Sequence, residues 1–165
     1  MENKTQKRIV TRVGDIFCVE LKEQKVYLQF IAIDTSYLNS VAIRVFKRKY
    51  PLDYVFNADE VVNDEVMFYA HTLIQPGLKQ GIWSKVGKSK DVGDLEKVLF
   101  RTTSDWTAER LKSYRWWVGG INKEYTMIGE LTEEYRQKTH EAAVVPPADI
   151  VEKIEFGEYQ GLIPY

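Results

Sequence analysis

The chain has 165 residues, of which 44% are hydrophobic and 28% charged, and its net charge is −1 at pH 7. This length and apolar content allow one domain with a sizeable core. The absence of a repeating period excludes solenoids and propellers, and the small net charge argues against bulk affinity for nucleic acid. No run approaches the ~18 apolar residues of a transmembrane helix, and Met1–Arg8 lacks the apolar stretch of a secretory signal.

We therefore expect a single domain, residues 1–165, with residues 1–12 as a flexible or loosely packed leader. The single cysteine, Cys18, cannot form an internal disulfide, which favours a cytoplasmic protein. A secreted protein that has lost its signal is the alternative.

Strand patterns dominate the first half. The turn at Gly14-Asp15 leads into a predicted strand over Ile16–Leu21, which forms a hairpin with Lys25–Asp34 and is followed by a strand over Val41–Phe46. Asn57 and the acidic residue three positions later have the spacing of a helix N-cap, so a short helix is expected there.

The middle of the chain returns to strand patterns. We expect strands over Val66–Ile74, Ile82–Val86 and Leu95–Arg101, with a turn at Pro76-Gly77 and a polar loop over Gly87–Gly93. Proline presets φ and glycine accepts φ > 0, which is why this dipeptide predicts a turn.

The last third predicts helices around one hairpin. Thr103-Ser104-Asp105 caps an expected helix over Trp106–Tyr114, and Arg115–Val118 pairs with Tyr125–Ile128. Further predicted helices are Glu133–Lys138, capped by Thr132, and Ala148–Phe156, which Pro146-Pro147 begins and Gly157 ends. The predicted fold class is α+β: a twisted antiparallel sheet or a partly open β-barrel with short helices packed on it, mainly C-terminal.

Residues with catalytic chemistry are few. Cys18 lies in an apolar strand and is expected to be buried and inert. His71 and His140 have no partner at metal-ligand spacing, and adjacent carboxylates on a helix point in different directions. Phosphate-binding glycine loops and the nucleophile elbow are absent from the sequence. We therefore predict a protein that is not an enzyme and has no metal or cofactor, and a hydrolase ranks last among the alternatives.

Charge is distributed unevenly. Residues 1–50 hold 10 Lys/Arg against 5 Asp/Glu, whereas residues 51–165 hold 13 against 19. Residues 130–158 alone hold 8 acidic and 3 basic side chains, which could steer a basic partner or could be the solvated faces of two short helices. In a strand, Trp116 and Trp117 point to opposite faces, so one of them could be exposed and bind a partner.

A basic run with interleaved aromatic residues, Arg44–Tyr50, is typical of single-stranded nucleic-acid binding. A solvated strand end protected by lysines gives the same pattern. Because the rest of the chain is acidic and would repel phosphate, nucleic acid is an unlikely partner by this reasoning.

Three segments in order resemble the immunity protein 26 family of bacterial polymorphic toxin systems. They are Gly14-Asp15-Ile16-Phe17, then Ile82–Gly87 with Val98-Leu99-Phe100, and Ile128–Thr132 with Pro146-Pro147 and Ile150. The resemblance implies a non-enzymatic protein that neutralises a toxin encoded beside it, and it transfers no catalytic residues.

The leading hypothesis is therefore a cytoplasmic immunity protein whose partner is a cognate protein toxin, with no membrane partner. The expected docking residues are Glu133, Glu134, Glu152, Glu155 and Trp117, facing a basic toxin domain. The alternative is a small single-stranded nucleic-acid-binding module that uses Arg44–Tyr50 and Lys85–Lys90. The sequence predicts no oligomeric state.

Overall fold

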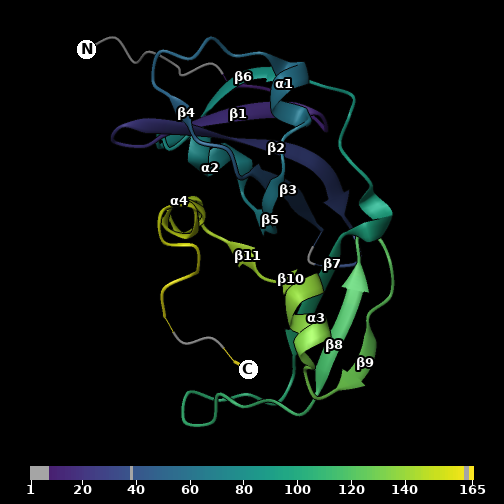
Figure 1. The fold of residues 1–165 in the computed structure, drawn as a ribbon. Coiled ribbons are helices and arrows are strands. Elements are labelled where there is room, and N and C mark those ends of the chain that lie inside the picture. The colour runs from purple at the N-terminus through teal and green to yellow at the C-terminus, as the bar shows by residue number, and fades with distance from the viewer. Residues whose placement is uncertain (1–7, 38, 162–163) are drawn as a thin grey trace, which may run out of the picture.

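A computed structural model describes residues 8–37, 39–161 and 164–165. The fold class is α+β, as predicted, with two open sheets and short helices rather than a closed barrel (Figure 1). The large sheet has the strand order β11-β5-β3-β2-β1-β6, and a short strand, β4, also pairs with β2. Its strands are β1 (Asp15–Glu20), β2 (Gln24–Asp34), β3 (Ser40–Phe46), β4 (Tyr50–Pro51), β5 (Val66–Thr72), β6 (Ser84–Lys88) and β11 (Val144–Val145).

The small sheet has the order β10-β7-β8-β9. Its strands are β7 (Leu99–Thr103), β8 (Trp116–Gly120), β9 (Thr126–Gly129) and β10 (His140–Glu141). The helices of the described residues are α1 (Ala58–Val62), α2 (Ile74–Lys79), α3 (Glu133–Lys138) and α4 (Pro147–Phe156), and a 3-10 turn covers Leu95–Lys97. Of these, α3 and α4 lie in the last third of the chain and α1 and α2 in its middle.

Strand alternation builds the core on both faces of the large sheet. In β1, Phe17 and Val19 point to one face, where they join a cluster with Trp83 of the α2–β6 connection and Ile150 and Ile154 of α4. A second cluster lies on the opposite face, under α1, and consists of Ile16, Cys18, Tyr27, Phe46, Tyr50, Val61 and Val62. The predicted burial of Cys18 is confirmed, and burial raises the pKa of its thiol.

The two sheets are joined where the last part of the chain passes between them. β10 pairs in parallel with β7 of the small sheet, and β11 pairs in parallel with β5 of the large sheet. We call this segment, residues 140–145, the strap. It leads directly into α4, which contacts α2 at the large sheet (Figure 1). A third buried cluster, which includes Ile31, Phe100 and Ala142, fills the junction.

Several predicted elements are confirmed by their hydrogen bonds. The β1–β2 hairpin pairs Phe17 with Leu28, and Asn57 caps α1 by accepting from the Glu60 amide at 3.2 Å. Thr132 Oγ1 caps α3 by accepting from the Tyr135 amide at 3.3 Å. Gly157 ends α4 in the left-handed conformation, at φ 83°, which favours glycine.

Three local predictions differ from the structure. Pro76-Gly77 does not form a turn between strands but lies within α2. A Cβ at Gly77 would lie 2.1 Å from Trp83 Cε2, so the glycine is required for the close approach of the indole ring, whose Nε1 donates to the Ile74 carbonyl at 3.1 Å. This tertiary contact overrides the local turn tendency.

The predicted helix over 106–114 does not form, and the segment is an irregular loop after β7. Asp105 accepts from the Ser113 hydroxyl and, at 3.1 Å, from the Tyr114 amide, instead of capping a helix at its own N-terminus. The predicted strand over 95–101 is also shifted, because Leu95–Lys97 is a 3-10 turn and β7 begins at Leu99.

Of the expected leader, residues 1–7 lie outside the described residues. Its described end contacts the domain: the Gln75 side-chain amide donates to the Ile9 carbonyl at 2.8 Å, and Lys85 Nζ donates to the Val10 carbonyl at 3.3 Å. Residues 9–10 therefore lie against α2 and β6.

Candidate functional site

A cavity of about 330 Å³ lies where the strap, the small sheet, the start of α4 and the C-terminal tail meet. We call it the strap pocket. Its walls come from segments that are far apart in the sequence, so it exists only in the folded chain. The lining residues are Arg101, Thr102, Thr103, Trp106, Trp116, Glu141, Ala142, Ala143, Val144, Val145, Pro146, Asp149, Tyr159, Gln160 and Pro164.

The charged groups on one side of the strap pocket are paired with one another. Arg101, only 9% exposed, donates from Nη2 to Glu141 Oε1 at 2.8 Å and from Nη1 to the Thr139 carbonyl at 2.6 Å. Lys153 Nζ donates to the other oxygen of Glu141 at 3.2 Å. Burial opposes ionisation of Glu141, but the Lys153 and Arg101 charges outweigh it and lower the pKa of this carboxyl. Glu141 therefore stays ionised and has no oxygen left without a cation partner.

Asp149 is the exception among the lining charges. It is exposed in the first turn of α4, and it has no ion-pair partner within the part of the chain that the structure describes. Burial raises the pKa of the Tyr159 hydroxyl, and the negative charges of Glu141 and Asp149 add to this effect. Asp149 thus acts electrostatically on the pocket without a counter-charge of its own.

Aromatic rings line the rest of the strap pocket. Trp116 of β8 is 3% exposed, and its indole Nε1 has no hydrogen-bond acceptor among the described residues. A buried N–H group without an acceptor is costly and therefore uncommon. Trp106, from the loop after β7, is 41% exposed, and Tyr159 follows α4.

The loop that carries Trp106 is held by Asp105 and by the end of the chain. Hydrogen bonds from Ser113 and the Tyr114 amide lower the pKa of Asp105 to about 2. The Ser113 amide donates to the Tyr165 carbonyl at 2.8 Å, and the Tyr165 amide donates to the Leu111 carbonyl at 3.0 Å. The C-terminus is thereby attached to this loop beside the strap pocket.

The predicted docking residues do not form one surface. Glu133 and Glu134 are exposed on α3, beside the small sheet, whereas Glu152 and Glu155 lie on α4, beside the large sheet (Figure 1). Trp117 is half-buried on β8 and points to the face opposite Trp116. The ring that lines the strap pocket is therefore Trp116, the neighbour of the predicted residue.

The acidic side chains of the two helices differ in their partners. On α3, Glu133 Oε2 lies 3.7 Å from Arg136 Nε, and Glu134 is bonded to Lys138, so cations of the same helix compensate both charges. On α4, no ion pair involves Glu152 or Glu155 within residues 8–37, 39–161 and 164–165. Two of the four predicted acidic residues are thus neutralised within their own helix.

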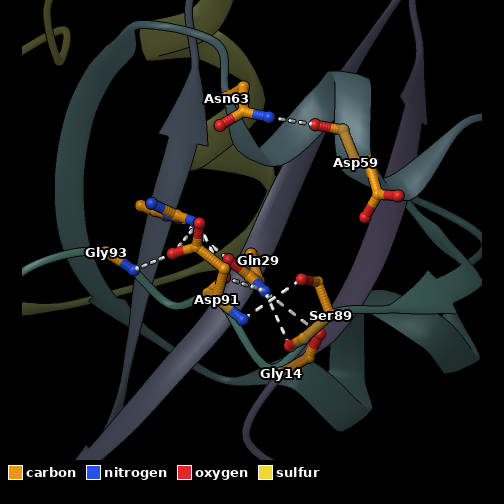
Figure 2. A network of polar contacts seen from close by, with 8 residues as sticks. Gly14, Gln29, Asp59, Asn63, Ser89, Asp91 and Gly93 are labelled. Carbon is orange, nitrogen blue, oxygen red and sulfur yellow. Dashed lines mark hydrogen bonds and ion pairs between the residues drawn. The ribbon is translucent and has the colours of Figure 1, made fainter.

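Around Arg44, by contrast, a second polar network is closed. Arg44, 4% exposed, donates from Nε to Gln29 Oε1 at 2.8 Å and from Nη2 to the Asp91 carbonyl at 2.9 Å. Figure 2 shows how Gln29 in turn donates to the carbonyls of Gly14, at 3.2 Å, and Ser89, at 3.3 Å. The network fastens the loop after β6 to the large sheet.

The surroundings of the run Arg44–Tyr50 bear on the nucleic-acid alternative. Phe46 and Tyr50 are buried, so the rings expected to stack on bases are packed in the core. Lys47 and Arg48 pair with Glu65 at 3.0 Å and Glu60 at 2.8 Å. In this conformation the run offers little free charge and no exposed stacking surface, although the alternative itself stays a prediction.

The sequence did not predict a buried histidine–aspartate pair. His71 Nε2 lies 2.9 Å from Asp34 Oδ2, both side chains are fully buried, and the Asn122 amide donates to Asp34 Oδ1 at 3.0 Å. Burial lowers the pKa of His71. The pair holds β2, β5 and the β8–β9 connection together. It lines neither the strap pocket nor the open groove beside β6.

A more open groove of about 800 Å³ runs beside β6. Its polar groups are largely satisfied: Trp83 Nε1 donates to the Ile74 carbonyl, and Lys85 Nζ lies 2.8 Å from Asp15 Oδ2. Among the described residues, no three His, Cys, Asp or Glu side chains converge as a metal site. The strap pocket is therefore the stronger candidate for binding.

Comparisons of the chain with protein-family models, with curated proteins and with solved structures found no match. None of the helices in the described residues is both long and apolar enough to cross a membrane.

Proposed function

We propose that this protein is a cytoplasmic immunity protein that binds and neutralises a cognate bacterial toxin domain by direct protein–protein contact. We further propose that the contact surface is the outer side of α4 together with the strap pocket. We call this the α4 face, defined by Asp149, Glu152, Glu155, Phe156 and the pocket. The family resemblance of the sequence supports the toxin as the partner.

The observation that carries the surface assignment is the uncompensated charge of α4. Asp149, Glu152 and Glu155 have no ion pair among the described residues, while α3 neutralises its own glutamates. Uncompensated acidic charge attracts a basic partner, raises its association rate and disfavours acidic competitors. A nuclease domain, whose substrate is anionic, is a basic partner of this kind.

Apolar surface next to the charge can supply affinity. Phe156, at the end of α4, is 66% exposed, and the aromatic lining of the strap pocket lies beside the first turn of the same helix. Large aromatic side chains surrounded by polar groups are the usual energetic centres of protein interfaces. The α4 face therefore combines steering charge with a place to bury partner side chains.

The test is rescue of bacterial growth by co-expression with the toxin domain encoded beside this protein. The double charge reversal E152K/E155K is compared with its matched control, E133K/E134K, which changes net charge equally on α3. We expect E152K/E155K to weaken toxin binding by about tenfold or more and to reduce rescue, because it repels a basic partner at the contact. The control should change affinity less than about threefold, since it alters only the distant field.

Thermal melts of both variants establish whether they are folded, which matters because Glu133, Glu134 and Glu155 are exposed but Glu152 is half-buried. Full rescue by E152K/E155K would reject the α4 face. If the adjacent gene encodes no toxin, or the wild-type protein gives no protection against it, the immunity function itself is rejected.

A further inference from the structure

We infer that the strap pocket accepts an arginine side chain presented by the protein partner. The inference rests on the proposed function, because it names the group of the partner that the α4 face recognises. It concerns a different feature from the steering charge of Glu152 and Glu155: a cavity with its own polar and aromatic lining.

The charges around the pocket favour a cation. Arg101, Lys153 and Glu141 form a closed set, in which each oxygen of Glu141 already has a cation partner, at 2.8 and 3.2 Å. Asp149 is then the only lining carboxylate without an ion pair in the described residues. Among the lining side chains Arg101 and Glu141 are paired, so Asp149 is the lining charge left without an ion pair in the described residues, and an entering cation would gain it as a partner.

The aromatic lining favours the same kind of occupant. Trp106, Trp116 and Tyr159 contribute rings to the pocket, and aromatic faces attract cations, tryptophan most strongly. The protein already uses this contact next to the pocket: Lys153 Nζ lies 4.2 Å from the ring centroid of Tyr159 and 4.8 Å from that of Phe68. An entering guanidinium group would meet rings of the same type.

The hydrogen-bonding capacity of Trp116 is an observation independent of the charges and of the aromatic lining. Its indole N–H is buried and has no acceptor among the described residues, although the ring lines the cavity. A small free cation has no acceptor to offer, but an arginine that belongs to a peptide brings a backbone carbonyl with it. Arginine also stacks on aromatic rings and is less strongly hydrated than lysine, so it enters a partly apolar pocket at lower cost.

The experiment titrates the full-length protein with the acetylated and amidated tripeptide Gly-Arg-Gly, in which the guanidinium is the only charge. The control peptide carries citrulline, which has the same shape and is neutral. Nuclear magnetic resonance follows the indole N–H signals of the four tryptophans. We expect saturable shifts of Trp106 and Trp116 with a Kd on the order of 1–10 mM, and binding of the citrulline peptide at least about fivefold weaker.

Two variants test the residues. Asp149→Asn should weaken the arginine peptide about fivefold, while its matched control on α3, Glu133→Gln, should leave the Kd unchanged within about twofold. Trp106→Ala should abolish the shift of Trp116, whereas Trp117→Phe, on the opposite face of β8, should not.

The inference is overturned if the citrulline peptide or a Gly-Lys-Gly peptide binds as tightly as the arginine peptide, or if no indole signal shifts at 50 mM, about fivefold above the weakest expected Kd. Its failure is separate from that of the proposed function. Loss of rescue by E152K/E155K together with no peptide binding rejects the arginine pocket and retains the α4 face. Peptide binding together with full rescue by E152K/E155K retains the arginine pocket and rejects the α4 face.

Discussion

Two buried arginines of this protein stand in different surroundings. Arg44 lies in the large sheet, where Gln29 and the Asp91 carbonyl accept its hydrogen bonds and the ring of Phe46 packs 4.9 Å from its guanidinium carbon. Arg101 lies in the small sheet and borders a cavity of about 330 Å³, where the indole N–H of Trp116 has no acceptor among the described residues. The first network is closed, and the second is open on one side.

The difference separates what the fold needs from what it leaves available. A closed network of satisfied polar groups specifies structure, because any change leaves a buried donor or acceptor without a partner. An open network keeps unused binding capacity, and this capacity is typical of ligand and partner sites. On this criterion Arg44 is structural, and the strap pocket beside Arg101 is the surface that we propose for recognition.

The largest expected effect comes from breaking the closed network. Arg44→Met removes the donor to Gln29 Oε1 and to the Asp91 carbonyl, and we expect it to lower the free energy of unfolding by about 3 kcal/mol. Arg48→Met is the matched control: Arg48 pairs with Glu60 on the surface, so it should cost less than about 1 kcal/mol. Urea denaturation measures both values. Equal losses for the two variants would contradict the structural role of Arg44.

A smaller loss of stability is expected for substitutions in the open network around Arg101. Its size depends on which carboxylate is replaced. Glu141→Gln leaves buried Arg101 and Lys153 without their shared counter-charge and should lower the free energy of unfolding by about 2 kcal/mol. Asp149→Asn removes a charge without an ion pair among the described residues and should change stability by less than about 0.5 kcal/mol. Differential scanning calorimetry distinguishes them. A destabilised Asp149→Asn variant would show that Asp149 has a structural partner and would weaken its assignment to binding.

Local signals predicted the elements whose causes are local. The alternating residues of β1 and β2, the cap at Thr132 and the stop at Gly157 are all within a few positions of the element they define. The wrong predictions have causes outside the element itself, such as the hydrogen bonds of Asp105 to Ser113 and Tyr114. Gly77 lies in a helix because Trp83 packs onto it.

The candidate site was harder to predict, because the strap pocket joins residues 101–103, 106, 116, 141–146, 149, 159–160 and 164. The acidic character of residues 130–158 did indicate α4, which borders the pocket, as part of a docking surface. The spacing of Glu133 with Arg136 and of Glu134 with Lys138 indicates the compensated pairs of α3 in the sequence, whereas no cation stands three or four positions from Glu152 or Glu155. Trp116-Trp117, by contrast, required the sheet register to identify which ring faces the cavity.

The smallest expected effect is a pH dependence that arises at the open network. Burial, together with the positive charges of Lys153 and Arg101, lowers the pKa of His140 to about 4. In the unfolded chain the pKa is near 6.5, so between these values the unfolded state binds a proton that the folded state does not. Stability is therefore fully present above about pH 6.5 and is lost as pH falls toward 4, by roughly 1 kcal/mol at pH 5.5.

His140→Phe isolates this contribution, because the phenyl ring can keep the packing on Tyr69 and Phe100 but cannot titrate. We expect the loss of stability between pH 7 and pH 5.5 to shrink in this variant by roughly 1 kcal/mol, measured by urea denaturation at each pH. The pH dependence that remains in the variant is due in large measure to His71, because burial also lowers the pKa of this histidine. If His140→Phe and wild type showed the same pH dependence, the pKa of His140 would be the same in the folded and unfolded states, and His140 would be largely protonated at pH 5.5. The open network would then carry one more positive charge than the strap pocket proposal assumes, and an arginine would be repelled from it at pH 5.5.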